Sequence, residues 1–260
     1  MKKPALLYYD LHSDVVAFST MRQGGFSVGN YAEFNINQFC GDDEEAIRRN
    51  RSLLCQTLGI GDDRLIMPHQ VHLAKVQRID EAFLVSSAEE RNQRLEGIDA
   101  VMTDLPGVCI GVSTADCIPI LLYDTCHHAV AAIHAGWRGT VSRIAEKAVA
   151  ALNAAYGSQP QDLKAQIAPG ISLDSFEVGD EVYDAFATAG FDMKAISRRQ
   201  AKWHVDLPAC NRLQLTAAGV SAANIAVADI CTVHNSSTFF SARCLGIQSG
   251  RIFTGIMMLK

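Results

Sequence analysis

The chain has 260 residues, 48% of them hydrophobic and 20% charged, which is enough apolar sequence to bury one sizeable core. Its net charge of −5 excludes a general electrostatic attraction to nucleic acid or acidic membranes, so we expect neither as a partner. The N-terminal stretch lacks the long apolar segment of a secretory signal, and no apolar run approaches membrane-spanning length. Eight cysteines are scattered without a Cys-x-x-Cys pair, as in a reduced protein, so we expect a soluble, cytoplasmic chain.

The first third of the chain contains one clear helix. Residues 22–29 form a glycine-bearing loop, and Asp43 introduces a helical stretch at 44–58 whose apolar residues fit one buried stripe. Gly59 is expected to end that helix.

The rest of the chain mixes strands and helices. Strand-like runs, separated by turn residues, occupy 64–67, 71–79, 100–103, 108–113, 118–123 and 129–134. Helical patterns follow at 140–156, 179–189 and 208–219, and late strands at 225–230 and 251–259. This interleaving favours an α/β fold with layers of mixed sheets and helices. Because no repeat or flexible linker interrupts it, we predict a single domain over residues 1–260.

Three polar side chains lie in otherwise apolar surroundings: His72, Cys117 and His134. Two imidazoles and one thiol are good zinc ligands. Since a tetrahedral site needs four donors, three protein ligands leave one position for water or substrate, as in a reactive zinc site.

Strand geometry indicates which histidine joins this group. Along an extended 68–72 segment the side chains alternate, so His69 and His72 are expected to point to opposite faces. His134 ends an apolar strand before a glycine-containing turn and a helix, where ligand sites of α/β sheets usually collect.

Simpler interpretations exist for each residue. A lone cysteine in apolar sequence is often a small buried hydrophobe, and a lone histidine is often a hydrogen-bonded core residue. Cys126-His127-His128 has closer metal-like spacing, but Asp124-Thr125 before it indicates an exposed turn.

The chain resembles the YfiH family, also called the multicopper polyphenol oxidase or laccase-domain family and now described as purine nucleoside phosphorylases. The resemblance runs nearly end to end, through Ser19-Thr20-Met21-Arg22-Gln23-Gly24-Gly25, Gly41-Asp42-Asp43, Asn50-Arg51, Gln70-Val71-His72, Thr114-Ala115-Asp116-Cys117, His134-Ala135-Gly136-Trp137-Arg138-Gly139, Ala168-Pro169-Gly170-Ile171, Phe176-Glu177-Val178-Gly179 and Phe239-Phe240-Ser241-Ala242-Arg243.

The resemblance implies a metal site, a fold and an activity. The family's metal ligands map onto His72, Cys117 and His134, with zinc as the expected ion and copper as an alternative. The family fold is a layered α/β structure likened to a bacterial cytotoxic necrotising factor, a cysteine-histidine hydrolase. The family's activities are phosphorolysis of adenosine, inosine and methylthioadenosine, adenosine deamination, and phenol oxidation with copper in some members.

Deamination follows most directly from a zinc site. Zinc lowers the pKa of water, and the resulting hydroxide attacks the purine carbon that bears the amino group, provided that an acid/base group moves protons. Asp116, adjacent to Cys117, is the candidate for this catalytic role beside Cys117 and His134. Its alternative role is a turn carboxylate that orients the loop.

Phosphorolysis requires a held phosphate, for which arginine is suited through bidentate contacts. Arg22, Arg51 and Arg138 occupy motif positions and are the phosphate candidates. Arg51 is alternatively a solvated helix-face charge, and Arg138 alternatively pairs with a carboxylate. Gly24-Gly25 resembles a phosphate-cradling loop, which a tight turn explains as well.

Two positions depart from the family pattern. Leu73 stands where a glycine commonly follows the motif histidine, and Cys244 stands where a second arginine is common, which removes a possible anion contact. Trp203, His204 and His234 lie outside the aligned motifs and receive no role.

Three function classes therefore remain open. The leading one is a zinc-dependent purine nucleoside enzyme whose small-molecule partners are nucleosides and phosphate. The second is a copper phenol oxidase, because divalent copper binds nitrogen and sulfur sites tightly. The third is a metal-free hydrolase with Cys117 as the nucleophile, activated by His134. The sequence leaves the oligomeric state open.

Overall fold

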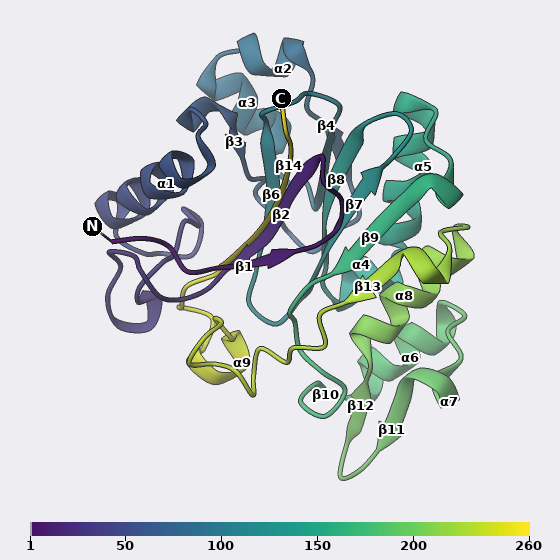
Figure 1. Ribbon diagram of the computed structural model, residues 1–260. Coiled ribbons are helices and arrows are strands. Elements are labelled where there is room, and N and C mark those ends of the chain that lie inside the picture. Colours follow the sequence, from purple (N-terminus) through teal and green to yellow (C-terminus); the bar gives the residue numbers. More distant parts are fainter. Residues whose placement is uncertain (1) are drawn as a thin grey trace.

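A computed structural model describes residues 2–260 and contains two β-sheets packed face to face, with helices on both outer sides (Figure 1). The five-stranded sheet has the order β1 (Leu6–Tyr9), β2 (Val15–Thr20), β14 (Ile252–Met258), β6 (Cys109–Thr114) and β3 (Leu65–Ile66). The six-stranded sheet has the order β13 (Ile225–Val227), β9 (Leu163–Ile167), β7 (Ile118–Asp124), β8 (Ala129–Ala135), β5 (Ala100–Thr103) and β4 (Val76–Arg78). Both sheets contain parallel and antiparallel pairs, so the predicted mixed α/β sheets are confirmed.

One hydrophobic core of the fold lies between the two sheets. Strand side chains alternate between faces, so Val130 and Ala132 of β8 contact the inter-sheet core. Their neighbours Ala131 and Ile133 point to the opposite side, toward helices. Strands buried on both faces read as continuous apolar runs, which is why β7 and β8 could be predicted from the sequence. The same alternation places His134 on the inter-sheet side of β8.

Helices cover the outer faces of the sheets. α1 (Glu44–Leu58) packs Leu54 and Cys55 against the five-stranded sheet. The outer face of the six-stranded sheet is covered by α5 (Ile144–Tyr156) and α8 (Leu207–Ala217), and α4 (Trp137–Val141) precedes α5. α2 (Glu81–Val85) and α3 (Ala88–Leu95) lie near the C-terminal end of β14 in Figure 1. Short 3-10 helices lie in the connections η1 (Gly29–Tyr31), η2 (Asp62–Arg64), η3 (Pro160–Asp162) and η4 (Ala222–Asn224).

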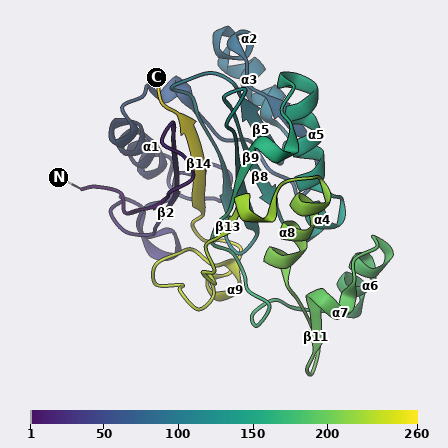
Figure 2. The same ribbon diagram turned by 45° about the vertical axis from the view of Figure 1, so that its right-hand side comes forward.

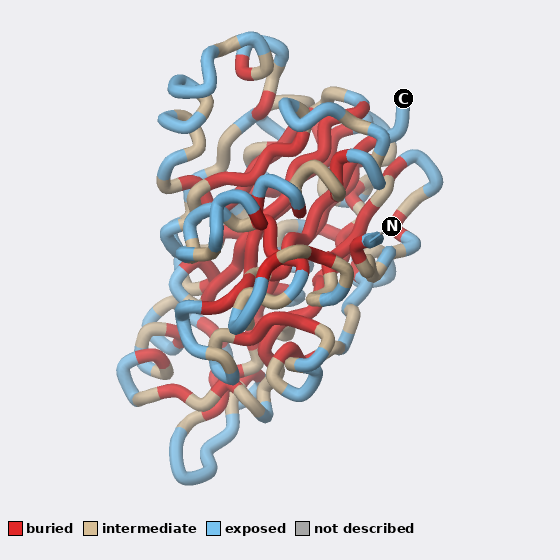
Figure 3. The backbone as a smooth tube through the Cα atoms, turned by 90° about the vertical axis from the view of Figure 1, so that its left-hand side faces the viewer, coloured by how far each residue is buried: buried red, intermediate tan, exposed pale blue. Residues whose placement is uncertain are grey.

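A small arm projects from the layered body (Figure 2). It contains α6 (Asp180–Thr188), α7 (Met193–Ile196) and a three-stranded sheet of β10 (Glu177–Val178), β12 (Trp203–Val205) and β11 (Ser197–Arg199). The buried residues follow the strands of the two large sheets, whereas exposed residues gather on loops and outer helix surfaces (Figure 3). α9 (Ala242–Leu245) lies beside the end of the sheets at which β14 begins (Figure 1).

Several predicted elements agree closely with the structure. The helix at 44–58 is confirmed, because the Asp43 carboxylate caps the Ala46 N–H at 2.8 Å and Gly59 ends the helix at φ 68°. β5, β6, β7 and β8 match the predicted strands within one residue at each end.

Some predicted elements are wrong in part, and among them the strand predicted at 225–230 ends at Val227. The strand at 71–79 shrinks to β4, because the segment before it turns sharply at His72. The helix at 140–156 is broken at Arg143, whose φ is 62°. The reason is that the Thr140 carbonyl accepts hydrogen bonds from the Gln214 side chain at 2.7 Å and the Arg143 N–H at 3.0 Å. In a continuous helix this carbonyl would accept a hydrogen bond from the N–H four residues later, so its use by these two donors accompanies the break.

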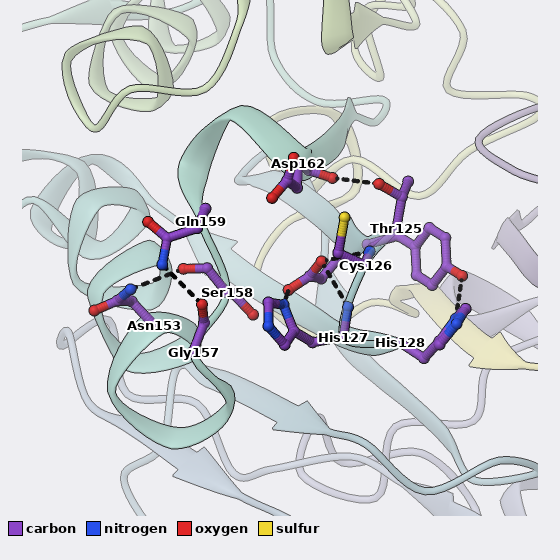
Figure 4. A network of polar contacts seen from close by, with 11 residues as sticks. Thr125, Cys126, His127, His128, Asn153, Gly157, Ser158, Gln159 and Asp162 are labelled. Carbon is purple, nitrogen blue, oxygen red and sulfur yellow. Dashed lines mark hydrogen bonds and ion pairs between the residues drawn. The ribbon is translucent and has the colours of Figure 1, made fainter.

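The turn between β7 and β8 carries its own polar network (Figure 4). The buried Asp124 carboxylate accepts hydrogen bonds from the backbone N–H groups of Cys126 and His127 and lies 3.0 Å from the His127 ring. His128 instead contacts the Tyr123 hydroxyl at 2.9 Å, so the two histidine rings point apart. Cys126 is exposed, and the described part of the chain carries its eight cysteines as free thiols.

Within residues 2–260, no helix combines the length and apolar character needed to cross a lipid bilayer.

Candidate active site

His134 lies at the end of β8 on the inter-sheet side and is 3% exposed. Its Nδ1 lies 2.7 Å from Oδ1 of Asp99, which is fully buried. Because an ionised carboxylate only accepts hydrogen bonds, Nδ1 of His134 carries the proton. Nε2 is then the atom left free for a metal or for a reacting group.

Asp99 also holds the loop that carries His72. Its carboxylate accepts hydrogen bonds from the backbone N–H groups of His72 at 3.0 Å and Leu73 at 2.8 Å. These bonds stabilise a left-handed backbone at His72, with φ 63°, which a non-glycine residue adopts only when its surroundings demand it. Gln70 ties the same loop to β6, because its side chain exchanges two hydrogen bonds with the Ser113 backbone, at 2.7 and 2.8 Å.

The left-handed turn changes the expected orientation of the histidines. Because the backbone turns into the left-handed region at His72, the expected alternation of His69 and His72 between faces is wrong, and both line the same pocket. His69 lies outside the metal group, where its ring stacks on Phe39 at 4.2 Å and contacts exposed Glu96. His72 joins the group, as predicted.

Cys117 lies in the connection between β6 and β7, in a loop fixed by Asp116. Asp116 has φ 85°, and its backbone carbonyl accepts a hydrogen bond from Ile171 at 2.7 Å. Its carboxylate accepts one hydrogen bond from the Thr232 hydroxyl at 2.6 Å and another from the Arg243 N–H at 2.7 Å. Both carboxylate oxygens are therefore used within the protein, and Asp116 does not line the pocket.

The three predicted metal ligands converge. One ligand atom from each of His72, Cys117 and His134 lies within 4.8 Å of the other two. The two imidazole rings meet edge to face with centroids 4.8 Å apart. This is the only such group of His, Cys, Asp or Glu donors in the described chain.

The electrostatics favour a thiolate. Burial opposes ionisation of Cys117, but the His134 charge and hydrogen bonds with both histidines outweigh it and lower the pKa of the thiol. Burial likewise opposes a charged His134, but Cys117 and the Asp99 carboxylate outweigh it and raise the pKa of the imidazole. A thiolate is the form that binds metals and attacks carbon.

The group lies in a pocket of about 260 Å³ at the ends of β6 and β8. The lining residues are Asn37, Phe39, Cys40, His69, Gln70, His72, Ser113, Thr114, Ala115, Cys117, His134, Ala242, Ile247 and Arg251. No carboxylate is among the described residues that line it, and Arg251 is its only arginine or lysine. Thr114 is 2% exposed, and its hydroxyl has no hydrogen-bond partner within residues 2–260. The pocket wall thus offers a donor and a cation to a bound molecule.

The three predicted phosphate arginines do not line this pocket. Arg22 donates to the Ala32 carbonyl at 3.1 Å and to Ser236. Arg51 donates to the Leu65 carbonyl at 3.2 Å, and burial lowers its pKa. Arg138 is exposed and lies over the Trp137 ring, 4.2 Å from its centroid.

Sequence reasoning missed Asp99, Thr114 and Arg251. A carboxylate directly before the buried strand β5 was a usable signal for Asp99, because a charge enters a core only with partners. Arg251 gave no local signal, since its place in the pocket depends on the pairing of β14 with β6.

A family model described as multi-copper polyphenol oxidoreductase laccase matches residues 16–259 of this chain. A purine nucleoside phosphorylase from Bacteroides thetaiotaomicron is 46% identical over 252 residues, covering 96% of this chain and 93% of the relative. Adenosine deaminase RL5 from an unknown prokaryotic organism is 46% identical over 245 residues, covering 93% of each protein.

Two solved structures share the fold. YfiH from Bacillus licheniformis, a hypothetical protein, aligns with a TM-score of 0.92 and 28% identity, covering 99% of this chain and 97% of that one. YlmD from Geobacillus stearothermophilus aligns with a TM-score of 0.90 and 30% identity, covering 97% of this chain and 94% of that one.

Proposed function

Because the chain belongs to the YfiH family, whose model is described as multi-copper polyphenol oxidoreductase laccase, we propose that it is a zinc-dependent enzyme of purine nucleosides. Its reactions are phosphorolysis of adenosine, inosine and methylthioadenosine to the free base and the corresponding ribose or methylthioribose 1-phosphate, and deamination of adenosine. The observation that carries the proposal is the convergence of His72, Cys117 and His134 at one pocket. The names of the two relatives at 46% identity support the substrate class.

The donor set fits zinc. Two imidazoles and a thiolate are ligand types of open, reactive zinc sites, and the mutual spacing of the ligand atoms, up to 4.8 Å, needs only a modest contraction around one ion. Zinc bound there would lower the pKa of water and polarise an oxygen or nitrogen of the substrate. Asp99 fixes the His134 tautomer and holds the His72 loop, so it is a positioning residue for two of the three ligands.

Within the pocket, proton transfer falls to groups other than carboxylates, because none of the described lining residues carries one. His134 and Cys117 are themselves ligands of this site, so we propose that they act in deamination by holding the zinc ion and not by carrying protons. Among the described lining residues, the His69 imidazole is a titratable group outside the ligand set. For Asp116 we propose the positioning role, since both of its carboxylate oxygens already accept hydrogen bonds from the protein.

Two alternatives each have one supporting observation. Copper phenol oxidation is favoured by the description of the family model, but a single group of three donors in the described chain supplies fewer coppers than four-electron oxygen reduction uses. A metal-free cysteine hydrolase is favoured by the lowered pKa of Cys117 beside His134, and it would extend the likeness to the cytotoxic necrotising factor fold.

Product analysis of adenosine tests the proposal. Wild-type protein and the His134→Ala variant are incubated with adenosine, each with and without phosphate. Adenine and ribose 1-phosphate that form only with phosphate, and are lost in the variant, support phosphorolysis, whereas inosine formed without phosphate supports deamination. No conversion by zinc-loaded wild-type protein contradicts the nucleoside assignment. Oxidation of a phenol by copper-loaded protein, measured in parallel, then decides for the oxidase.

We also propose that residues 1–260 form one domain, because the inter-sheet core combines residues from Leu11 to Met258. The cytoplasmic location stays a prediction of the sequence.

A further inference from the structure

Arg251 is the cation of the candidate pocket, and the protein fixes its position. It directly precedes β14, and its guanidinium donates to the backbone carbonyls of Ser249 at 2.5 Å, Ile247 at 2.7 Å and Gly250 at 3.0 Å. Carbonyl contacts hold a guanidinium without neutralising its charge. The group is therefore oriented before any ligand arrives, which reduces the entropy lost on binding.

The positive charge of Arg251 has no carboxylate partner. None of the ion pairs formed by residues 2–260 includes it. The described lining of the pocket also lacks any carboxylate, so an anion that enters meets no like charge from Asp or Glu. Pre-oriented arginines of this kind are suited to planar or tetrahedral oxyanions.

A second observation indicates that the pocket takes a polar ligand. Thr114 is 2% exposed, lines the pocket and has a hydroxyl without a partner in the described chain, an arrangement that is unfavourable unless a ligand or water completes it. β6 and β14 are paired with Thr114 opposite Ile252. The unpaired cation and the unpaired hydroxyl therefore lie at neighbouring strand ends.

We propose that Arg251 binds the inorganic phosphate consumed in phosphorolysis; the proposal rests on the function proposed above. In that reaction a phosphate oxygen forms a bond to the anomeric carbon of the nucleoside while the bond from that carbon to the purine nitrogen breaks. The electron pair leaves with the purine, which takes up the proton that the hydrogen phosphate gives up, and ribose 1-phosphate remains. Arg251 holds the phosphate group in both the substrate and the sugar phosphate product.

The first test compares steady-state constants of wild type, Arg251→Gln and Arg251→Lys. In Arg251→Gln we expect the KM for inorganic phosphate to rise about tenfold or more, as for the loss of a charge-assisted contact, while the KM for adenosine stays within about twofold. Arg251→Lys keeps the positive charge but lacks the paired N–H donors of a guanidinium. We therefore expect its KM for phosphate to lie between those of wild type and Arg251→Gln. Phosphate-independent deamination of adenosine is measured in parallel, and in both variants it should change by a smaller factor than the KM for phosphate does.

Direct binding supplies a readout that does not depend on turnover. Calorimetric titration of zinc-loaded protein with inorganic phosphate should show weaker binding in Arg251→Gln than in wild type. The same titration with ribose 1-phosphate should weaken in parallel, whereas weakening for the sugar phosphate alone would assign Arg251 to the product and overturn the phosphate proposal. The exposed Arg212→Gln on α8, outside the pocket, is the matched control and should bind phosphate as wild type does.

Two further outcomes would overturn the proposal. The first is an unchanged phosphate KM and unchanged phosphate binding in a folded Arg251→Gln protein. The second is a raised phosphate KM in Arg138→Gln together with a normal one in Arg251→Gln, which would return the role to the motif arginine. If wild type binds phosphate through Arg251 but shows no phosphate-dependent turnover, the anion site stands and the proposed phosphorolysis fails. If Arg251→Gln melts at a lower temperature than wild type, Arg251→Lys decides the KM comparison.

Discussion

Asp99 and His134 form a buried carboxylate–imidazole pair, with Oδ1 of Asp99 2.7 Å from Nδ1 of His134. The same carboxylate holds the backbone of His72, so one side chain positions two of the three candidate ligands. Burial opposes its ionisation, but the His134 and loop contacts outweigh burial and keep the pKa of Asp99 below its usual value.

Asp99→Asn should weaken zinc binding about 10–100-fold, since the amide cannot supply the charge that supports His134. Zinc affinity is measured by competition with a chelating dye. Glu96→Gln is the control, because the exposed Glu96 side chain contacts only the His69 ring, which lies outside the metal group, and its loss should leave zinc affinity unchanged. Equal zinc affinity in Asp99→Asn and wild type would contradict the positioning role.

Removal of the metal should abolish nucleoside turnover, and added zinc should restore it. It should also lower the melting temperature of the protein, because a ligand at about 100 times its dissociation constant stabilises the folded state by about 2.7 kcal/mol. Turnover that persists after chelation but stops on alkylation of Cys117 would instead favour the metal-free hydrolase.

Gly136→Ala should disturb the site with little effect on the fold. A Cβ at Gly136 would lie 3.0 Å from both Cys117 Sγ and His72 Cδ2, although the backbone there, at φ −66° and ψ 168°, suits any residue. We expect zinc affinity to fall about tenfold, the factor that corresponds to about 1.4 kcal/mol. Gly61→Ala is a matched control, because its backbone is similar (φ −75°, ψ 156°) and the added Cβ meets only the flexible Asp63 side chain. Unchanged zinc affinity in Gly136→Ala would show that the ligands tolerate the added carbon.

Asp116→Asn separates loop positioning from proton transfer. Asparagine tolerates the left-handed backbone at φ 85° and still accepts hydrogen bonds, so deamination should stay within about threefold of wild type, with an unchanged pH profile. Asp116→Ala loses both side-chain contacts and should be less stable by about 2–4 kcal/mol, measured by urea unfolding. Loss of deamination in a stable Asp116→Asn protein would restore Asp116 as the proton shuttle.

The β7–β8 turn predicts a pH effect on stability. Burial opposes ionisation of Asp124, but the nearby Ser158 hydroxyl and the hydrogen bonds from the backbone N–H groups of His127 and Cys126 outweigh burial and hold its pKa below the ordinary value. The stabilisation is therefore complete above the unfolded pKa, about 3.9, and is lost as the pH falls through the lower folded value. Asp124→Asn should lower the free energy of unfolding by about 2 kcal/mol at pH 7 and flatten its loss in acid.

Urea unfolding from neutral pH to pH 2 measures this effect. Asp174→Asn, which removes an exposed carboxylate paired with Arg198, is the control and should change stability by less than about 1 kcal/mol. Equal acid sensitivity of wild type and Asp124→Asn would contradict the prediction.

Elements governed by local chemistry could be predicted from the sequence. The helix at 44–58 is capped by Asp43 at its N-terminus and ends at Gly59. Strands buried on both faces are recognisable in the sequence as apolar runs. The three members of the candidate metal group could also be named, because each of them interrupts such sequence.

Features that depend on residues far away in the sequence could not be predicted. The turn at His72 exists because Asp99 binds its backbone, and the helix break at Arg143 exists because Gln214 binds Thr140. Motif position indicated Arg22, Arg51 and Arg138. The Arg22 and Arg51 guanidinium groups, however, bind backbone carbonyls outside their motifs, and that of Arg138 lies over its motif neighbour Trp137. Arg251 enters the pocket only through strand pairing.

The central place of β14 in the five-stranded sheet has a consequence for synthesis. β14 lies between β2 and β6, so a chain released before residue 252 leaves two strand edges without partners. Such edges are templates for aggregation. The anion-binding Arg251 precedes this strand directly, so a nascent chain acquires a complete pocket only after almost all of the described sequence has left the ribosome.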